Sequence, residues 1–327
     1  MRLGLITPFA VGTIEQVMMA VMRVKYGVLR LIGLTDKVLI IDELHSYDAY
    51  MSKIISTLLI WCRVLQIPVV MLSATLPAGK KEEYATIYDS TVTFSEQKSY
   101  PCITAFYENM GIQQYPVTGS HQKMDIAIEL LPILNNTTSI AVLVVQEVEK
   151  NSGCYCVLCN TVNGAQKLYQ EVMKLDEHLP VLLCHARFHA KRRNELEKEC
   201  IQKLGVNSKK RPEKLLVIAT QVVEQSLDVD FDYIFMDICP LDLLFQRIGR
   251  LWRHEETKRP QAISQPKVSV FIPTNNDFGV TGIVYPPIIL EKSLNILKNK
   301  TILHLPDDIP SFVNQTYICP THVGMNR

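Results

Sequence analysis

The sequence predicts an α/β fold with two parallel-sheet domains. Residues 37–42 (KVLIID) and 68–73 (PVVMLS) are short apolar runs, typical of strands buried on both faces, and a helical pattern over 48–64 lies between them. A strand, a helix and a strand joined by short connections form a parallel βαβ unit. A second alternation of helices and strands extends to residue 251, and 327 residues are enough for about two domains.

The elements of the first domain follow from periodicity. Residues 13–30 and 48–64 carry apolar side chains at helical spacing, which predicts a helix in each segment. Residues 95–120 lose periodicity and contain prolines and glycines. We interpret this stretch as the last strand of the domain followed by a linker.

The second domain resumes the alternation. The predicted helices span 124–149, 163–174, 189–204 and 242–251, and the predicted strands span 154–160, 181–184, 215–220 and 233–237. The basic loop 209–212 is interpreted as a solvated turn. The predicted domains are 1–112 for the first, 113–275 for the second, and 276–327 for a linker and the start of a C-terminal region.

The composition is that of a globular protein. Hydrophobic residues make up 47%, charged residues 20%, and the net charge of +1 argues neither for nor against a nucleic-acid partner. Nine cysteines without a paired framework, and a start without a signal peptide, predict reduced thiols and a cytoplasmic location. The most apolar region, 54–76, is broken by Arg63, Gln66 and Pro68, so no membrane span is expected.

A pair of acids follows the first predicted strand. The carboxyl end of a strand in a parallel sheet faces the ligand crevice, so Asp42 could hold Mg²⁺ through water while Glu43 orients an attacking water. We assign His45 to the same nucleotide site, where it could couple the site to the neighbouring domain. The alternative is a cluster of helix-capping residues, with Asp48 starting the next helix.

Small polar residues follow the next strand. Ser73, Ala74 and Thr75 are placed to hydrogen-bond the acid motif and so to couple the nucleotide state to domain geometry. Helix capping would account for the same residue types.

An arginine motif occurs late in the second domain. Arg247, Arg250 and Arg253 recur every three residues, which predicts that they lie near one helical face. Arg250 and Arg253 are the candidates for stabilising charge on a γ-phosphate, and Gln246 for reading the nucleotide. The alternative is an amphipathic surface helix. Gly249 favours function, because glycine within a helix costs about 1 kcal/mol relative to alanine.

Other polar residues also follow predicted strands of the second domain. Most of them are suited to contacts with the backbone of a nucleic acid. Asp228 is instead assigned to the nucleotide. These candidates are Asn160, Thr161, Arg187, Thr220, Gln221, Gln225 and Asp228. Phe188 follows Arg187, a pairing that suits base stacking.

The usual phosphate-binding loop is missing from the sequence. We find no match to G-x-x-x-x-G-K-[ST], and Gly79-Lys80 is followed by Lys81. Without the backbone N–H groups and lysine of that loop, the acids and arginines would face an unanchored nucleotide.

The order Asp-Glu-x-His, Ser-Ala-Thr, Gln-Arg-x-Gly-Arg is the superfamily 2 helicase series. The amino-acid sequences of several segments closely resemble the corresponding motifs of the CRISPR-associated helicase-nuclease of type I systems. These segments are 7–16, 41–48, 159–162, 250–254 and 281–287. The resemblance implies two RecA-like helicase domains, the first incomplete, and a partial C-terminal segment. It also implies an ATP- and Mg²⁺-dependent 3′-to-5′ translocase on single-stranded DNA, with Thr13 near the DNA backbone and an RNA-guided surveillance complex as partner.

Three hypotheses follow. The first is a fragment of such a helicase-nuclease, inactive alone because the phosphate-binding loop and the nuclease domain are absent. In that case a separate chain carrying the missing halves is a candidate partner. The second is a non-catalytic module from a split or decayed gene that binds DNA or a partner. The third is a fragment of a generic superfamily 2 RNA helicase.

Overall fold

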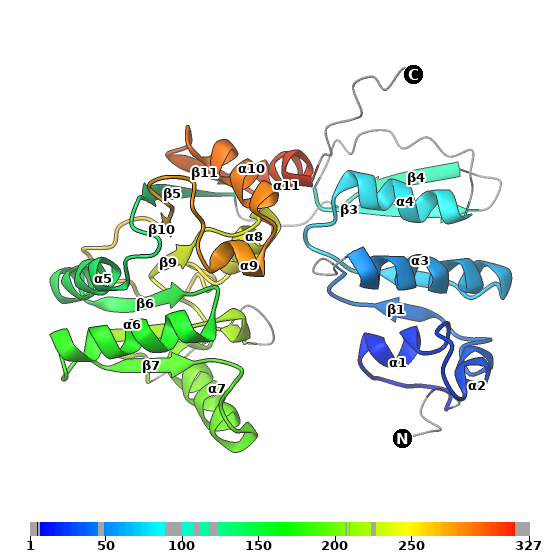
Figure 1. Cartoon of the computed structure of the whole chain (residues 1–327), viewed down its shortest axis with the longest axis horizontal. Coiled ribbons are helices and arrows are strands. Elements are labelled where there is room, and N and C mark those ends of the chain that lie inside the picture. Colours follow the sequence, from blue (N-terminus) through cyan, green and yellow to red (C-terminus); the bar gives the residue numbers. More distant parts are fainter. Residues whose placement is uncertain are drawn as a thin grey trace. The chain divides into compact units, whose positions relative to one another are not determined.

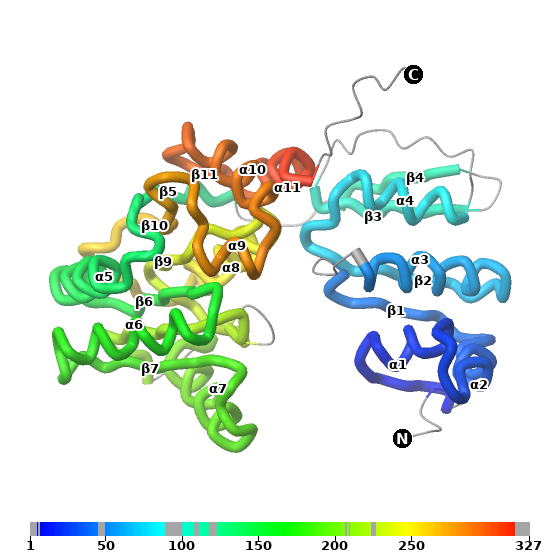
Figure 2. Tube along the Cα trace, viewed as in Figure 1, coloured from blue at the N-terminus to red at the C-terminus, as the bar shows by residue number. Residues whose placement is uncertain are grey.

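The computed structural model divides the chain into two compact units. Unit 1 comprises Met1–Ser120 and Tyr317–Arg327, and unit 2 comprises His121–Thr316 (Figures 1 and 2). The structure describes residues 5, 7–44, 49–88, 100–107, 111–117, 123–206, 208, 210–223 and 227–317.

Unit 1 contains a parallel strand pair and a hairpin. Strands β1 and β2 pair in parallel, with Ile41 opposite Met71. The predicted strand–helix–strand unit is therefore confirmed, although both strands are shorter than predicted. The elements are α1 (Ile14–Met18), α2 (Gly27–Ile32), β1 (Leu39–Ile41), α3 (Ala49–Val64), β2 (Val69–Met71), α4 (Ala78–Tyr88), β3 (Cys102–Tyr107) and β4 (Gly111–Pro116).

Two predictions for unit 1 were wrong in detail. The single helix over 13–30 is instead the two short helices α1 and α2, because the chain turns between them and Tyr26 takes a left-handed φ of 68°. Within the stretch 95–120, interpreted as a strand followed by a linker, the described residues form two strands, and β3 pairs antiparallel with β4.

Unit 2 is built on one mixed sheet. Among the described residues the strand order is β11-β5-β10-β9-β6-β8-β7, and all neighbours are parallel except β11 and β5. Helices α5 and α6 pack against each other (Figure 1). The strands are β5 (Met124–Leu131), β6 (Gly153–Leu158), β7 (Val181–Cys184), β8 (Lys214–Ala219), β9 (Tyr233–Asp237), β10 (Lys267–Phe271) and β11 (Ile302–Leu305). The helices are α5 (Thr137–Asn151), α6 (Val162–Leu175), α7 (Ala190–Leu204), η2 (3-10, Gln221–Val223), α8 (Leu241–Ile248), α9 (Thr281–Val284), α10 (Pro287–Leu297) and α11 (Asp308–Tyr317).

The predicted helix over 124–149 was wrong at its start. Its first part is strand β5, where Ile126 and Ile128 are buried and Ala127 between them is only half-buried. The helix α5 begins only after Asn136, whose side chain accepts a hydrogen bond from the Ser139 amide at 3.0 Å. An alternation of two residues, followed by a capping asparagine, is the signal of a strand and a new helix.

The chain beyond residue 260 contributes to the same sheet. Strand β10 lies between β5 and β9, and β11 pairs antiparallel with β5. Both elements belong to unit 2, which extends to Thr316. The predicted divisions at residues 112 and 275 stay predictions.

The two units have separate hydrophobic cores. The core of unit 2 includes a layer of aromatic rings on neighbouring strands, in which Tyr155, Tyr233, Phe235 and Phe271 stack with centroids 4.6–6.4 Å apart. The core of unit 1 is smaller and centres on α3. No helix in the described part of the chain is long and apolar enough to cross a membrane.

Candidate nucleotide site and nucleic-acid interface

The acid motif of unit 1 lies at the carboxyl end of β1. Asp42 and Glu43 follow Ile41 directly, and both residues are exposed. An Asp42 Oδ1 atom accepts the Glu43 amide at 2.9 Å, and Glu43 takes a left-handed φ of 56°. Non-glycine residues in that region are uncommon and collect at functional sites. His45 lies outside the described residues.

The polar residues after β2 lie beside this motif. The backbones meet where the Leu44 amide donates to the Leu72 carbonyl at 3.1 Å, just before Ser73. The Ser73 hydroxyl accepts the Thr75 amide at 3.3 Å, a local contact of the kind that caps a turn. The Thr75 hydroxyl is buried without a hydrogen-bond partner in the described part of the chain, so it can still serve a ligand. Ala74 accepts the Tyr100 hydroxyl at 2.7 Å through its carbonyl.

These residues fit Mg²⁺ only in combination with a nucleotide. The described residues contain no group of three or more His, Cys, Asp or Glu side chains that could hold a metal ion. Mg²⁺ in nucleotide sites keeps several waters and uses one or two carboxylates together with substrate phosphates. The exposed Asp42 carboxylate is compatible with that mode.

The arginine motif of unit 2 is not one helical face. Helix α8 ends at Ile248 and Gly249 is its C-cap, so Arg250 and Arg253 follow the helix. Trp252 takes a left-handed φ of 48°, which changes the chain direction between the two arginines. The predicted common face was therefore wrong, and Gly249 is explained by the end of the helix.

Arg247 instead stabilises the interior. Its side chain is fully buried, and the guanidinium donates to Asn160 Oδ1 at 3.0 Å and to the Asp237 carbonyl at 3.3 Å. Burial raises the pKa of Asp237, and the positive charge of Arg247 opposes that rise. Gln246 is half-buried, and its amide nitrogen has no hydrogen-bond partner among the described residues.

Arg253 is held by a carboxylate that the sequence assigned to the nucleotide. Its Nε atom donates to Asp228 Oδ1 at 2.7 Å, and His254 Nε2 lies 3.1 Å from the same oxygen. The hydrogen bonds from His254 and Arg253 lower the pKa of Asp228. Arg253 stays 41% exposed, so its guanidinium is oriented and still accessible. Arg250 Nε donates to the Val223 carbonyl at 3.4 Å.

A buried ion-pair network contacts the backbone of Arg253, and it was not predicted from the sequence. Arg259 donates to both Asp230 oxygens at 2.9 and 2.8 Å and to Asp232 Oδ1 at 2.8 Å. Arg211 donates to the same Asp232 oxygen at 2.8 Å, and both carboxylates are buried. The alternating acids 228, 230 and 232 were the available signal. The solvated turn predicted at 209–212 was wrong for Arg211.

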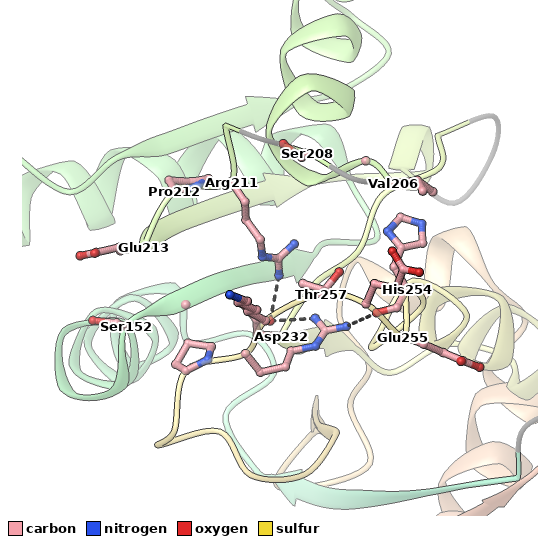
Figure 3. A pocket seen from close by; sticks show the side chains of 16 residues that line it. Ser152, Val206, Ser208, Arg211, Pro212, Glu213, Asp232, His254, Glu255 and Thr257 are labelled. Atoms are coloured by element: carbon pink, nitrogen blue, oxygen red, sulfur yellow. Dashed lines mark hydrogen bonds and ion pairs between the residues drawn. The ribbon is translucent and has the colours of Figure 1, made fainter.

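The network joins the arginine motif to the start of the central strands. Asp230 Oδ1 accepts the Arg253 amide at 2.9 Å, and Asp232 Oδ2 accepts the Cys154 amide at 2.7 Å. Figure 3 shows Arg211, Asp232 and His254 around one cavity. The cavity has a volume of about 980 Å³, and Arg259 also lines it. The cavity lies at the amino ends of β6 and β8, because Gly153 and Glu213 line it.

The nucleic-acid candidates of unit 2 lie at the opposite, carboxyl ends of the strands. Asn160 follows β6, Arg187 follows β7, and Thr220 and Gln221 follow β8. Gln221 Nε2 donates to the Asn160 carbonyl at 3.3 Å, so the structure brings these two together. Arg187 is exposed, and the neighbouring Phe188 ring stacks on buried His185 at 4.0 Å.

Several of these candidates also have a structural task. The side-chain Nδ2 of Asn160 donates to the Ile238 carbonyl at 2.8 Å, and the residue is 3% exposed. Thr161 caps α6 by accepting the Gly164 amide at 3.0 Å, and Thr220 is buried. Thr13 is exposed and precedes α1 in unit 1. Gln225 lies outside the described residues. Contact with nucleic acid remains a prediction for all of them.

Comparison with known proteins relates the chain to one family. The sequence model of "CRISPR-associated nuclease/helicase Cas3, C-terminal" matches residues 151–256. The CRISPR-associated nuclease/helicase Cas3 of Streptococcus thermophilus is 34% identical over 94% of this chain and 34% of its own length. The Cas3 endonuclease/helicase of Escherichia coli K12 is 35% identical over 82% of this chain and 31% of its own length.

Solved structures agree with this relationship. The crystal structure of T. fusca Cas3 is 32% identical, with a TM-score of 0.87, over 97% of this chain and 39% of that chain. A chain of a structure titled "CRISPR RNA-guided surveillance complex, pre-nicking" is 31% identical, with a TM-score of 0.84, over 97% of this chain and 42% of that chain. The two units therefore have the α/β architecture of the Cas3 helicase domains. The chain spans about a third of the length of its curated relatives.

Proposed function

Because this chain belongs to the family of CRISPR-associated Cas3 nuclease/helicases, we propose that it forms the part of an ATP-driven DNA translocase that completes a nucleotide site. Its role is in antiviral CRISPR defence in the cytoplasm, where invading DNA is met. The substrates are ATP with Mg²⁺ and single-stranded DNA. A T. fusca relative with the same fold is titled as a complex with ATP, which supports nucleotide use.

The observation that carries the proposal is the preorganised Arg253. Its guanidinium is oriented by Asp228 at 2.7 Å, and its backbone is fixed by buried Asp230 at 2.9 Å. Arginines held in advance stabilise negative charge that develops on a transferring phosphoryl group, because little reorganisation is needed at the moment of reaction. Asp228 then acts by orienting Arg253, and Arg250 and Gln246 complete the nucleotide-facing set.

The acids of unit 1 are proposed for the metal-dependent part of ATP hydrolysis. Bound Mg²⁺ would neutralise phosphate charge in this site. Asp42 would hold the ion through a water, and the exposed Glu43 carboxylate would orient the attacking water and accept its proton. Ser73, Ala74 and Thr75 would transmit the state of the site to the neighbouring domain, with the unpartnered Thr75 hydroxyl as the group that responds. His45 belongs to the same proposed site.

The carboxyl edge of the unit 2 sheet is proposed as the track for single-stranded DNA. Polar groups of this kind suit contacts with phosphate, sugar or base atoms, and an exposed arginine beside an aromatic ring suits a backbone contact next to a stacked base. Thr13 is the proposed contact in unit 1. The set in unit 2 is Asn160, Thr161, Arg187, Thr220, Gln221 and Gln225.

Two partners are proposed. An RNA-guided surveillance complex is the first, because a relative of the same fold occurs in a structure with that title. The second is a polypeptide with a phosphate-binding loop, since the 327 residues contain no G-x-x-x-x-G-K-[ST] motif. The same observation favours a second candidate function, a non-catalytic module that binds DNA or a partner without turnover.

The test compares hydrolysis with binding. We expect the purified chain to bind a fluorescent single-stranded oligonucleotide but to show no DNA-stimulated ATP hydrolysis above background. Adding a polypeptide that carries the phosphate-binding loop of a relative should produce hydrolysis. Arg253→Ala should then lower that hydrolysis about a thousandfold, and Glu43→Gln should abolish it. Arg192→Ala, on the exposed face of α7, is the matched control and should change nothing.

Each outcome separates the hypotheses. Hydrolysis by the chain alone that is lost in Glu43→Gln would contradict the expected dependence on a second polypeptide. DNA binding without hydrolysis in any mixture would support the non-catalytic module. Equal affinity for RNA and DNA, with neither favoured, would point to a generic helicase fragment.

A further inference from the structure

Helix α9 lies at the same edge of the unit 2 sheet as the proposed DNA contacts. Asn160 follows β6, and its side-chain Nδ2 donates to the Thr281 hydroxyl at the start of α9 at 3.3 Å. Gln221, after β8, donates from Nε2 to the Tyr285 hydroxyl at 3.4 Å, just beyond the end of α9. One four-residue helix thus connects the ends of two strands that are adjacent in the sheet.

The position of this helix is fixed from several sides. The Gly279 amide donates to an Asp277 carboxylate oxygen at 2.9 Å, and the Asp277 carbonyl accepts the Asn135 side chain at 3.1 Å. Thr281 is buried, and the Tyr285 ring packs against the unit 2 core. A hydroxyl on such a rigid support can hold a flexible glutamine side chain in one rotamer.

We propose that Tyr285 is a positioning residue of the single-stranded DNA site, which acts by orienting the Gln221 side chain. The inference rests on the proposed function, because it assumes that Gln221 contacts DNA. The same Gln221 nitrogen also donates to the Asn160 carbonyl, so Tyr285 and the end of β6 share the amide N–H₂ group. The amide oxygen is thereby directed away from them, and it is the Gln221 atom left to accept a hydrogen bond from a nucleobase N–H donor, because the DNA backbone offers only acceptors.

The consequence is a specific coupling between two side chains. Removing the Tyr285 hydroxyl releases Gln221 to several rotamers, and each binding event must then order it again. A hydrogen bond of this kind contributes about 0.5–1.5 kcal/mol, so affinity for single-stranded DNA should fall about two- to tenfold. The fold should be unaffected, because phenylalanine keeps the ring packing.

The experiment is a double-mutant cycle on oligonucleotide affinity. Fluorescence anisotropy with a labelled oligothymidine would measure the Kd of the full chain, Tyr285→Phe, Gln221→Ala and the double variant, with melting temperatures in parallel. Tyr169→Phe, on α6, is the control for loss of a tyrosine hydroxyl and should leave the Kd unchanged. We expect the Tyr285→Phe loss to vanish in the Gln221→Ala background.

The outcomes separate this inference from the function on which it rests. An unchanged Kd in Tyr285→Phe, with a weaker Kd in Gln221→Ala, would overturn the positioning role and leave the DNA site intact. Additive losses would also overturn it, because Tyr285 would then act independently of Gln221. A full chain that binds no oligonucleotide would overturn both. If the melting temperature of Tyr285→Phe falls, Gln221→Glu is the second variant. This change removes the amide donor of residue 221 and leaves Tyr285 in place. A wild-type Kd for Gln221→Glu would refute the coupling.

Discussion

Replacing Arg259 by methionine should destabilise unit 2 more than any surface change. Its guanidinium makes three hydrogen bonds of 2.8–2.9 Å to Asp230 and Asp232. The two carboxylates are 0% and 1% exposed, so Arg259 and its neighbours shield them from water in the intact protein. Asp232 would retain the Arg211 guanidinium at 2.8 Å. Asp230 would keep the Arg253 amide at 2.9 Å, but its nearest remaining cationic side chains, Arg211 and His254, are each 3.9 Å away.

The expected loss follows from the buried charge that remains. Breaking a buried ion pair by removing one partner costs about 3–5 kcal/mol, because the other charge is left uncompensated. At a urea slope of about 1–3 kcal/mol per molar, that loss lowers the unfolding midpoint by about 1 M or more. Methionine keeps much of the stem volume, so the loss reports on charge and not on packing.

The assay uses a tryptophan that lies beside the network. The Arg259 guanidinium lies 5.0 Å from the centre of the Trp252 ring, and Trp61 is the other of the two tryptophans in the sequence. Urea unfolding followed by fluorescence in a Trp61→Phe background, with circular dichroism as a second probe, therefore reports on unit 2.

The control is an exposed ion pair of the same unit. Arg192 lies 3.5 Å from Glu195, and their side chains are 55% and 50% exposed, so Arg192→Met should cost less than about 1 kcal/mol. A loss in Arg259→Met no larger than in this control, at an unchanged urea slope, would refute the reasoning that Arg259 neutralises the buried acids.

Two further predictions concern single groups. His304 Nδ1 lies 2.8 Å from Asp125, and this hydrogen bond raises the pKa of the imidazole above 6.5. The pair should therefore make a small contribution to the free energy of unfolding. That contribution should be fully present below the pKa of His304 in the unfolded chain, and it should be lost as pH rises through the higher pKa of His304 in the folded protein. Histidine NMR titration should show the raised pKa, and Asp125→Asn should return it toward 6.5; no change in the variant would contradict the pairing. Gly279→Ala should cost about 1–2 kcal/mol in urea unfolding, because φ is +51° and the added Cβ would lie 2.5 Å from Asn135 Oδ1. Gly79→Ala, where open space surrounds the new Cβ, is the control and should cost nothing.

The strand ends were predictable because a simple rule governs them. In a parallel sheet the carboxyl ends share one edge, so Asp42, Asn160 and Thr220 could be located from the apolar run before each of them. The rule says nothing of side-chain partners. That Asn160 would bind Arg247, and that Asp228 would hold Arg253, depends on segments far apart in the sequence.

The missed elements have local physical causes. Residues 267–271 form a strand between two others, yet Ser269 interrupts their apolar run, and its hydroxyl is satisfied by Tyr233 at 2.8 Å. A buried serine with a partner on the next strand looks like a surface residue in sequence alone. The arginine spacing failed as a helix signal because α8 stops at Ile248 and the left-handed Trp252 redirects the chain.

The pairing of β11 with β5 has a consequence for how unit 2 could be engineered. His304 lies opposite Asp125 in this antiparallel ladder, so the first and last strands of the unit are neighbours. A linker long enough to run back along α11 could therefore join residues 316 and 123, and new termini could be opened in an exposed loop elsewhere in the unit. Such a circular permutant would keep every strand neighbour of the sheet while separating unit 2 from the rest of the chain, so that unit 2 could be studied alone.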